Sequence, residues 1–215
     1  MLQATALSRI NHAVRIAARL FVTAGFLLLG YAAYVSIDAQ AYQMRAHSEL
    51  EAARHQTPGS ASPASDPEPT DGATLGQIRI PRLGLSAMIV EGDSPPNLRR
   101  AVGHLPETAR PGEPGNVVLA GHRDTFFRPL ERIREGDSIL VRTRTADYNY
   151  RVDSIAIVGP EAVEVIATTA ARTLTLITCF PFAYVGAAPQ RFIVRAHDSG
   201  VVHHVVSLAA MPVPH

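Results

Sequence analysis

An uncharged apolar segment near the N-terminus constrains this chain more than any other feature. From Leu20 to Ile37 the sequence LFVTAGFLLLGYAAYVSI contains no charged residue, and its length suits a helix that crosses the hydrocarbon core of a bilayer. Three arginines precede this segment and Asp38 follows it, a charge distribution that favours a cytoplasmic N-terminus. We therefore expect a membrane-spanning signal anchor at 20–37, a cytoplasmic segment at 1–19, and the rest of the chain outside the membrane.

Two other interpretations of this segment remain open. A buried core helix would need other helices to cover it, and the remaining sequence shows no second helix-rich segment. A cleaved signal peptide is the other alternative, because Ala39-Gln40-Ala41 has the small-x-small form that signal peptidase accepts and Tyr42 would then be the new N-terminus. The apolar segment is longer than the hydrophobic region of most signal peptides, which favours an uncleaved anchor.

Two segments of different composition follow the apolar one. Residues 38–56 are rich in Ala and Glu, which predicts a short helical stalk. Residues 57–73 consist mainly of Pro, Ser, Asp and Gly and cannot bury enough apolar surface to fold. We expect a flexible linker there, which spans roughly 50 Å if it extends by about 3.1 Å per residue.

The fold class of residues 74–198 follows from the spacing of short apolar runs. Gly, Pro and Asp separate these runs, a pattern that is typical of a mainly β domain such as a small barrel or sandwich. Brief helices are expected at 128–133 and 163–167, and the tail at 199–215 carries no clear signal. Strands are predicted at 76–80, 85–90, 116–122, 138–143, 148–158, 172–179 and 191–196.

The residue types present exclude several classes of chemistry. Cys179 is the only cysteine, so an intramolecular disulfide and a multi-cysteine metal site are both excluded. The chain has no lysine, so no lysine can act as a base or form a Schiff base. A formal net charge of +1 argues against a dedicated nucleic-acid-binding protein. A lone cysteine is commonly a small buried hydrophobe, so its surroundings decide whether it is a nucleophile.

Strand alternation places three chemically useful residues on outward faces. In RTLTLITC, Leu174 and Leu176 take the core side, so Cys179 lies on the opposite side at a strand end. The same parity, applied to NVVLAGH and RFIVR, puts His122 and Arg191 outward as well. Parity alone does not place the three strands side by side.

These three side chains suit acyl transfer through a thioester. A thiolate is the nucleophile in such a reaction, and a neighbouring His⁺ or Arg favours it. A histidine such as His122 can protonate a leaving amine near neutral pH. An arginine such as Arg191 can hold a substrate carbonyl or its developing oxyanion with permanently charged donors.

The motifs around these residues resemble the sortase family. GNVVLAGHRDTFFRPL has His122 in a GH element, TLTLITC has Cys179 in a TLxTC element, and Arg191 starts the last strand, in the family's order. The TFF after the histidine and the Pro-Phe after the cysteine are most similar to class D sortases. The resemblance covers 74–196 and implies an eight-stranded β-barrel. It also implies that Cys179 is the nucleophile, His122 the general acid/base and Arg191 the substrate or oxyanion stabiliser.

The resemblance further implies a reaction, partners and a location. Sortases cleave an LPxTG-like sorting signal between Thr and Gly and pass the acyl group to an amine, such as that of a peptidoglycan precursor or a pilin lysine. The partners would be surface proteins or pilins that carry this signal, and the catalytic domain would lie outside the cell membrane. The residues expected to line the groove for the substrate are Thr178, Phe180, Phe182, Tyr184, Val163 and Ile166.

No cofactor, metal ion or nucleic acid is expected for this activity. Calcium needs several clustered oxygen ligands, and Glu161 and Glu164 are the only acids in the loop expected to form the groove. Glu107 and Glu113 would have to approach from elsewhere in the chain.

Weaker candidates and other functions also remain open. His104, in AVGHLPET, is a second candidate acid, but it lies in a turn-rich segment outside the family's catalytic pattern. One alternative function is a tethered β-barrel binding module with an inert cysteine. Another is a different wall-directed cysteine peptidase or transpeptidase, although TCFPF is unlike the Ser-His-Gly-Cys element expected of an L,D-transpeptidase.

Overall fold

The computed structural model describes residues 2–56, 68–184 and 186–202. The chain divides into two compact units, Met1–Ala41 and Tyr42–His215. Residues 57–67 of the predicted linker and residues 203–215 of the predicted tail lie outside the described residues.

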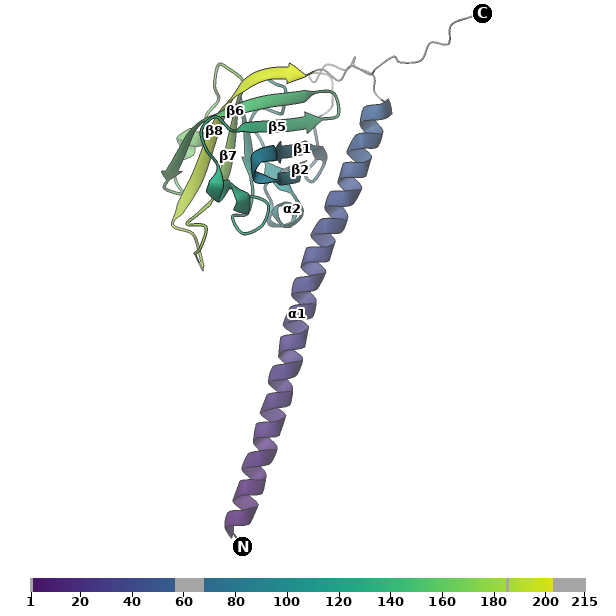
Figure 1. Ribbon diagram of the computed structural model, residues 1–215, viewed down its shortest axis with the longest axis vertical. Coiled ribbons are helices and arrows are strands. Elements are labelled where there is room, and N and C mark those ends of the chain that lie inside the picture. Colours follow the sequence, from purple (N-terminus) through teal and green to yellow (C-terminus); the bar gives the residue numbers. More distant parts are fainter. Residues whose placement is uncertain (1, 57–67, 185, 203–215) are drawn as a thin grey trace, which may run out of the picture. The chain divides into compact units, whose positions relative to one another are not determined.

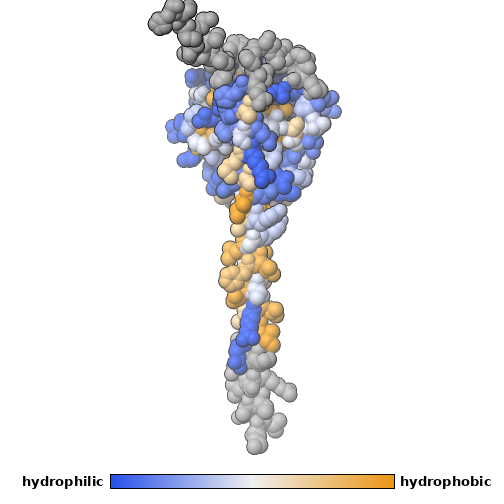
Figure 2. All heavy atoms as spheres, turned by 90° about the vertical axis from the view of Figure 1, so that its right-hand side faces the viewer, coloured by the Kyte–Doolittle hydropathy of each residue, from blue (hydrophilic) through white to orange (hydrophobic). Residues whose placement is uncertain are grey.

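One long helix, α1 (Leu2–Gln56), contains the apolar segment (Figure 1). Large apolar side chains on it, among them Phe21, Phe26 and Ile37, are exposed, and Figure 2 shows hydrophobic residues gathered along this helix. Within the described part of the chain, α1 alone is long and apolar enough to cross a membrane, judged by length and composition. The helix runs without a break through the predicted anchor and the predicted stalk.

The last turns of α1 belong to the second unit and pack against its barrel. Ala46 and Leu50 are buried in a small apolar cluster with Met88, and buried Arg54 forms an ion pair with Asp147 at 2.8 Å. These three helix residues are four apart, so they share one face of the helix. The predicted stalk is therefore a helix end that is docked on the barrel rather than an isolated spacer.

Eight strands close into a barrel in the order β1-β2-β3-β4-β7-β8-β6-β5 (Figure 1), which confirms the predicted fold class. A barrel of eight strands has an interior that side chains alone can fill. The strands are β1 (Thr74–Ile80), β2 (Leu85–Glu91), β3 (Val102–His104), β4 (Asn116–Ala120), β5 (Ser138–Thr143), β6 (Asp147–Val158), β7 (Thr173–Phe180) and β8 (Gln190–Val202). The short helices are η2 (Pro81–Leu83), α2 (Pro95–Arg100), η3 (Arg128–Arg132) and η4 (Val163–Ile166).

The differences from the predicted elements are local. Strand β3 and helix α2 were not predicted, because three and six residues are too few to show a clear periodicity. Strand β8 continues to Val202 instead of ending at Ala196. Residues 72 and 73, the last two of the predicted linker, are already bound to the end of β2. The Gly72 amide donates to the Glu91 carbonyl at 2.8 Å, and the Glu91 amide donates to the Ala73 carbonyl at 2.9 Å.

The core of the barrel confirms the alternation inferred from the sequence. Leu174 and Leu176 of β7 are fully buried in the central cluster, together with Val117 and Leu119 of β4 and Val194 of β8. The alternate residues of these three adjacent strands therefore face the outside of the barrel. Two of those outward positions carry Cys179 and Arg191, and His122 follows two residues after the end of β4.

Candidate active site

Cys179 and Arg191 lie opposite each other on adjacent strands. Strands β7 and β8 are antiparallel, and their register pairs Cys179 with Arg191. Residues paired in this way have Cα atoms about 5 Å apart and side chains on the same face of the sheet. Both residues are partly exposed. The fold thus brings a thiol and a guanidinium group together on the outer surface of the barrel.

His122 approaches the same end of β7 from β4. The Gly121 amide donates to the Ile177 carbonyl at 3.1 Å, and the Thr178 hydroxyl donates to the Gly121 carbonyl at 2.7 Å. These two hydrogen bonds fix Gly121 beside the residues that immediately precede Cys179. Because His122 follows Gly121 directly, it lies at the strand end that carries the thiol.

A close packing contact explains why glycine precedes His122. A Cβ atom on Gly121 would come within 2.7 Å of the Phe127 ring, and Phe127 is completely buried. The Phe127 amide also donates to the His122 carbonyl at 3.1 Å. The glycine of the GH element and the second phenylalanine of TFF therefore pack together and hold His122 in a compact turn.

The same turn holds the loop between β7 and β8. Arg123 donates from Nη2 to the carbonyls of Tyr184 at 2.8 Å and Gly186 at 3.0 Å, and its guanidinium carbon lies 5.7 Å from the centre of the Tyr184 ring. Arg128 donates from Nη1 to the Phe182 carbonyl at 2.8 Å. Sequence reasoning missed this role of the two arginines, because their partners are more than fifty residues away along the chain.

Three of the residues predicted to line a substrate groove lie at the end of β7 or in the turn directly after it. Thr178 and Phe182 are only 2% and 7% exposed. The ring of Phe182 packs against Phe192 with centroids 5.1 Å apart, and the partly buried ring of Phe180 stacks on Phe192 at 6.2 Å. Thr178 and Phe182 therefore offer little side-chain surface to a substrate, and their contact with one stays a prediction.

The other three predicted groove residues are accessible. Val163 and Ile166 of η4 are 72% and 37% exposed, and Tyr184 in the loop between β7 and β8 is 46% exposed. Large apolar side chains on an outer surface are available to contact an apolar ligand. Their contact with a substrate stays a prediction.

His104 is buried in the barrel wall and does not lie in a turn. It ends β3, is 1% exposed, and places Nδ1 2.9 Å from Oε2 of Glu91. Its Nε2 lies 3.0 Å from the Ala109 carbonyl, which can only accept a hydrogen bond, so Nε2 carries a proton. His104 therefore ties β3 to the end of β2 and is not placed to serve as an acid for an external substrate.

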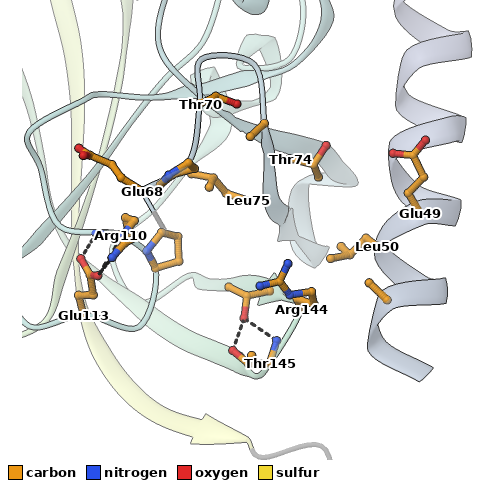
Figure 3. Close-up of a pocket in the computed structure, with 15 residues that line it drawn as sticks. Glu49, Leu50, Glu68, Thr70, Thr74, Leu75, Arg110, Glu113, Arg144 and Thr145 are labelled. Atoms are coloured by element: carbon orange, nitrogen blue, oxygen red, sulfur yellow. Dashed lines mark hydrogen bonds and ion pairs between the residues drawn. The ribbon is translucent and has the colours of Figure 1, made fainter. Parts of the chain in front are cut away.

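A cavity of about 630 Å³ lies away from the three candidate catalytic residues. Glu49 and Leu50 of α1 line one side, and Leu75, Arg110 and Arg144 are among the residues that line the others (Figure 3). The residues that line it do not include Cys179, His122 or Arg191. This cavity is therefore not the site of the thiol chemistry.

The acidic residues considered for a calcium site do not form a cluster of ligands among the described residues. Glu113 is bonded to Arg110 with Oε1 2.9 Å from Nε, and the acidic loop residue Glu164 lies in η4. In the described ranges, no group of three or more His, Cys, Asp or Glu residues is arranged to hold a metal ion.

Comparisons with known proteins identify relatives that share this arrangement of strands. A family model described as the sortase domain matches residues 78–199. Sortase D of Bacillus subtilis (strain 168) is 30% identical over 183 residues, which cover 80% of this chain and 92% of that protein. The structure of a Clostridium perfringens sortase D5 transpeptidase aligns with a TM-score of 0.60 and 26% identity over 77% of this chain and 99% of that one. A SrtA sortase from Actinomyces oris aligns with a TM-score of 0.58 and 30% identity over 67% of this chain and 91% of its own.

Proposed function

The chain belongs to the sortase family of cysteine transpeptidases and is similar to class D, and from this premise we propose that Cys179, His122 and Arg191 are its catalytic residues. The observation that carries the proposal is the register of β7 and β8, which sets Cys179 opposite Arg191. The hydrogen bonds of Gly121 add His122 at the same strand end.

The proposed reaction forms and resolves a thioester on Cys179. The thiolate attacks the carbonyl of the substrate threonine, the Thr–Gly amide bond breaks, and the acyl group becomes bound to sulfur. His122 gives a proton to the departing glycine amine. An acceptor amine then attacks the thioester, gives a proton to His122, and leaves with the acyl group in a new amide bond, so the thiolate and the protonated imidazole are both regenerated.

Arg191 is suited to the oxygen atoms of the substrate. Its Nη1 donates to the carbonyls of Ala188 at 3.3 Å and Gln190 at 3.1 Å. Hydrogen bonds of this length near solvent are weak, so a substrate carbonyl can replace them at small cost. A guanidinium group beside the reacting carbonyl stabilises the negative charge that develops on its oxygen.

We infer that the substrate is an LPxTG-like sorting signal at the C-terminus of a surface protein or pilin. Val163, Ile166 and Tyr184 offer exposed apolar surface, which suits the leucine and proline of such a signal. The acceptor would be an amine of a peptidoglycan precursor or of a pilin lysine.

We further infer that α1 anchors the enzyme in the cell membrane, with the catalytic domain outside. The uncharged segment 20–37 and the arginines before it support this orientation. Protease added to intact spheroplasts should then cut between residues 57 and 67 and separate the barrel from α1 on a denaturing gel, since the end of α1 packs on the folded barrel. Protection in intact spheroplasts, with cleavage only after lysis, would reverse the orientation, and a mature N-terminus at Tyr42 would show that the anchor is cleaved.

The central experiment traps the acyl-enzyme. Full-length protein in detergent is mixed with a panel of LPxTG-like peptides, and intact-mass spectrometry should show one acyl adduct that hydroxylamine removes. Cys179→Ala should form no adduct and should keep the wild-type circular dichroism spectrum. Turnover by the folded alanine variant would remove the proposal.

Thiol alkylation tests the alternative of an inert cysteine. The Cys179 side chain is partly exposed, so it should react with iodoacetamide in the native protein. An inert cysteine in a binding module would react only after denaturation.

A further inference from the structure

The outer face formed by β4, β7 and β8 is covered, although it lies outside the core of the barrel. Val118, Thr175 and Ile193 occupy outward positions on these strands, yet they are 0%, 0% and 2% exposed. The loop at 159–172 is hydrogen-bonded to outward residues of β4 and β8 on this face. It starts where Val158 pairs with Arg191, and it joins β7 at the end opposite to Cys179, so it must pass back along this face.

The side chain of Asn116 uses all of its hydrogen-bonding groups, and two of its hydrogen bonds hold this loop. The side chain is 2% exposed, and its Nδ2 donates to the carbonyls of Val165 at 3.1 Å and Ala167 at 3.2 Å. Its Oδ1 accepts from the hydroxyls of Thr175 at 2.7 Å and Thr173 at 3.3 Å. Since the two carbonyls can only accept, the amide has one orientation, and all four of its hydrogen bonds are made.

Arg195 holds the same loop from β8. Its Nη2 donates to the carbonyls of Glu164 at 3.2 Å and Val165 at 3.3 Å. Arg195 pairs with Thr175 on β7, and β7 lies between β4 and β8, so the two contacts come from the strands on either side of β7. Together Asn116 and Arg195 bind the carbonyls of residues 164 and 165 in η4 and of residue 167 directly after it.

The loop has few strong hydrogen bonds of its own. Short bonds join the Val163 amide to the Glu161 carbonyl and the Thr169 hydroxyl to the Ala171 carbonyl, both at 2.8 Å. At the C-terminal half of η4, however, the amides of Val165 and Ala167 donate to carbonyls at 3.4 Å and 3.3 Å, near the limit for a useful bond. The side chain of Val163 is 72% exposed and does not anchor it, whereas Ile166 is 37% exposed. The position of η4 therefore depends on the two side chains that reach it from the barrel wall.

We propose that Asn116 and Arg195 form a clamp that positions η4 as a wall of the substrate groove. Both are positioning residues, and the proposal rests on the proposed function because it assigns η4 to the binding of the sorting signal. Neither residue reaches the thiol: Arg195 lies four residues from Arg191 along β8, a distance of about 13 Å. The clamp thus acts on substrate affinity and not on the chemistry of the thioester.

Three variants of the full-length protein in detergent test the clamp. Asn116→Asp keeps the shape and the oxygen that accepts from the threonines, but it sets a carboxylate oxygen against two carbonyls. Arg195→Gln replaces the arginine, at a partly exposed position, by a shorter side chain without the guanidinium group, so the hydrogen bonds to η4 are lost. Arg195→Lys restores a donor at the end of a long side chain. Arg151→Gln is the matched control, since Arg151 also donates to a backbone carbonyl, that of Gly136 at 2.9 Å, outside this loop.

The first readout is hydrogen exchange and needs no substrate. Peptides that cover 159–172 should exchange about tenfold faster in Asn116→Asp and Arg195→Gln, as expected for the loss of hydrogen bonds of ordinary strength. Arg195→Lys and Arg151→Gln should match the wild type in this segment. Unchanged exchange at 159–172 in folded Asn116→Asp and Arg195→Gln would overturn the clamp, and if the aspartate variant does not fold, Arg195→Gln alone decides.

The second readout is the KM for the sorting peptide that acylates the wild type best. KM should rise about tenfold in Arg195→Gln and return to the wild-type value in Arg195→Lys, with kcat within about twofold throughout. An equal loss in kcat, or a KM that stays constant while the loop exchanges faster, would overturn the assignment to substrate binding. If no peptide acylates the wild type, the proposed function fails separately, and the exchange result still decides the clamp.

Discussion

The hydroxyl of Thr178 donates a 2.7 Å hydrogen bond to the carbonyl of Gly121. Thr178 is the residue before the thiol and Gly121 the residue before the imidazole, so this one contact joins the two segments that carry the proposed nucleophile and acid. Thr178 is 2% exposed, which keeps the bond away from competing water. The contact therefore sets the relative position of Cys179 and His122.

Thr178→Val should reduce the acylation rate with little change in fold. Valine has the same shape but leaves the Gly121 carbonyl without its partner, which costs about 1–3 kcal/mol of stability. The shift of His122 relative to the thiol should lower the single-turnover acylation rate by about tenfold or more. Thermal unfolding and single-turnover mass spectrometry measure the two effects.

Thr178→Ser provides the matched control for this prediction. It keeps the hydroxyl and loses only a methyl group, so acylation should stay within about threefold of the wild type. A serine variant as slow as the valine variant would show that packing by the methyl group matters, and not the hydrogen bond.

Replacement of His104 should lower the stability of the protein, whereas replacement of His122 should remove its turnover. His104→Gln removes one partner of a buried hydrogen bond with Glu91 and should cost about 1–3 kcal/mol of stability. The folded fraction should still acylate at a rate near that of the wild type. His122→Ala should unfold at the wild-type temperature and lose nearly all turnover, because the leaving amine has no proton donor. The opposite pattern, measured by thermal unfolding and by rate per folded molecule, would mean that His122 is not the acid.

The barrel could be predicted from the sequence because its longer strands alternate clearly. Leu174 and Leu176 identify the inner face of β7, and the structure buries both of them completely. Strand β3 could not be predicted, because Val102–His104 is three residues long and pairs on both sides only through tertiary contacts. The docking of α1 was missed for a similar reason, since Ala46 and Leu50 form a stripe too narrow to signal a partner.

The site was predictable only in part. Alternation places Cys179 and Arg191 on outer faces, but their pairing depends on the register of β7 and β8, which no local pattern encodes. The burial of Thr178 and Phe182 depends on the strands that meet at this end of the barrel. The roles of Asn116 and Arg123 were missed because their partners lie about fifty or more residues away in the chain.

Arg191→Lys should be severely impaired, whereas Arg195→Lys should be nearly neutral. Arg191 faces Cys179, while Arg195 faces Thr175, so only the first can contact the reacting carbonyl. A lysine keeps the charge at 191 but loses the planar fork that offers two fixed donors, and the loss of one such preorganised donor commonly costs about 10²–10³ in rate.

At position 195, a single terminal nitrogen makes both hydrogen bonds, and an ammonium group can replace it. Single-turnover acylation of one peptide by both variants provides the measurement. Near wild-type acylation by Arg191→Lys would show that directional hydrogen bonding is not the role of Arg191.

The ion pair between Arg82 and Asp137 should make stability fall in acid. Asp137 is 7% exposed, and its carboxylate accepts from Nε of Arg82 at 2.5 Å and from the Arg134 amide at 2.8 Å. The hydrogen bond from Arg82, followed by the amide of Arg134, holds the pKa of Asp137 below its usual value of 3.8. A carboxyl group whose pKa is lower in the folded state stabilises the protein above its unfolded pKa, and this contribution disappears as pH falls through the folded pKa.

Asp137→Asn isolates this contribution, because asparagine has nearly the same shape and does not titrate. The wild type should unfold at a higher temperature than the variant at pH 7, and the difference should shrink steadily below about pH 4, where the unfolded carboxylate begins to take up protons. Arg82 stays charged over this whole range, because the Asp137 carboxylate raises the pKa of the guanidinium group above its usual value. Thermal unfolding of both proteins between pH 7 and pH 2 is the measurement, and a difference that is constant with pH would show that charge on Asp137 does not contribute.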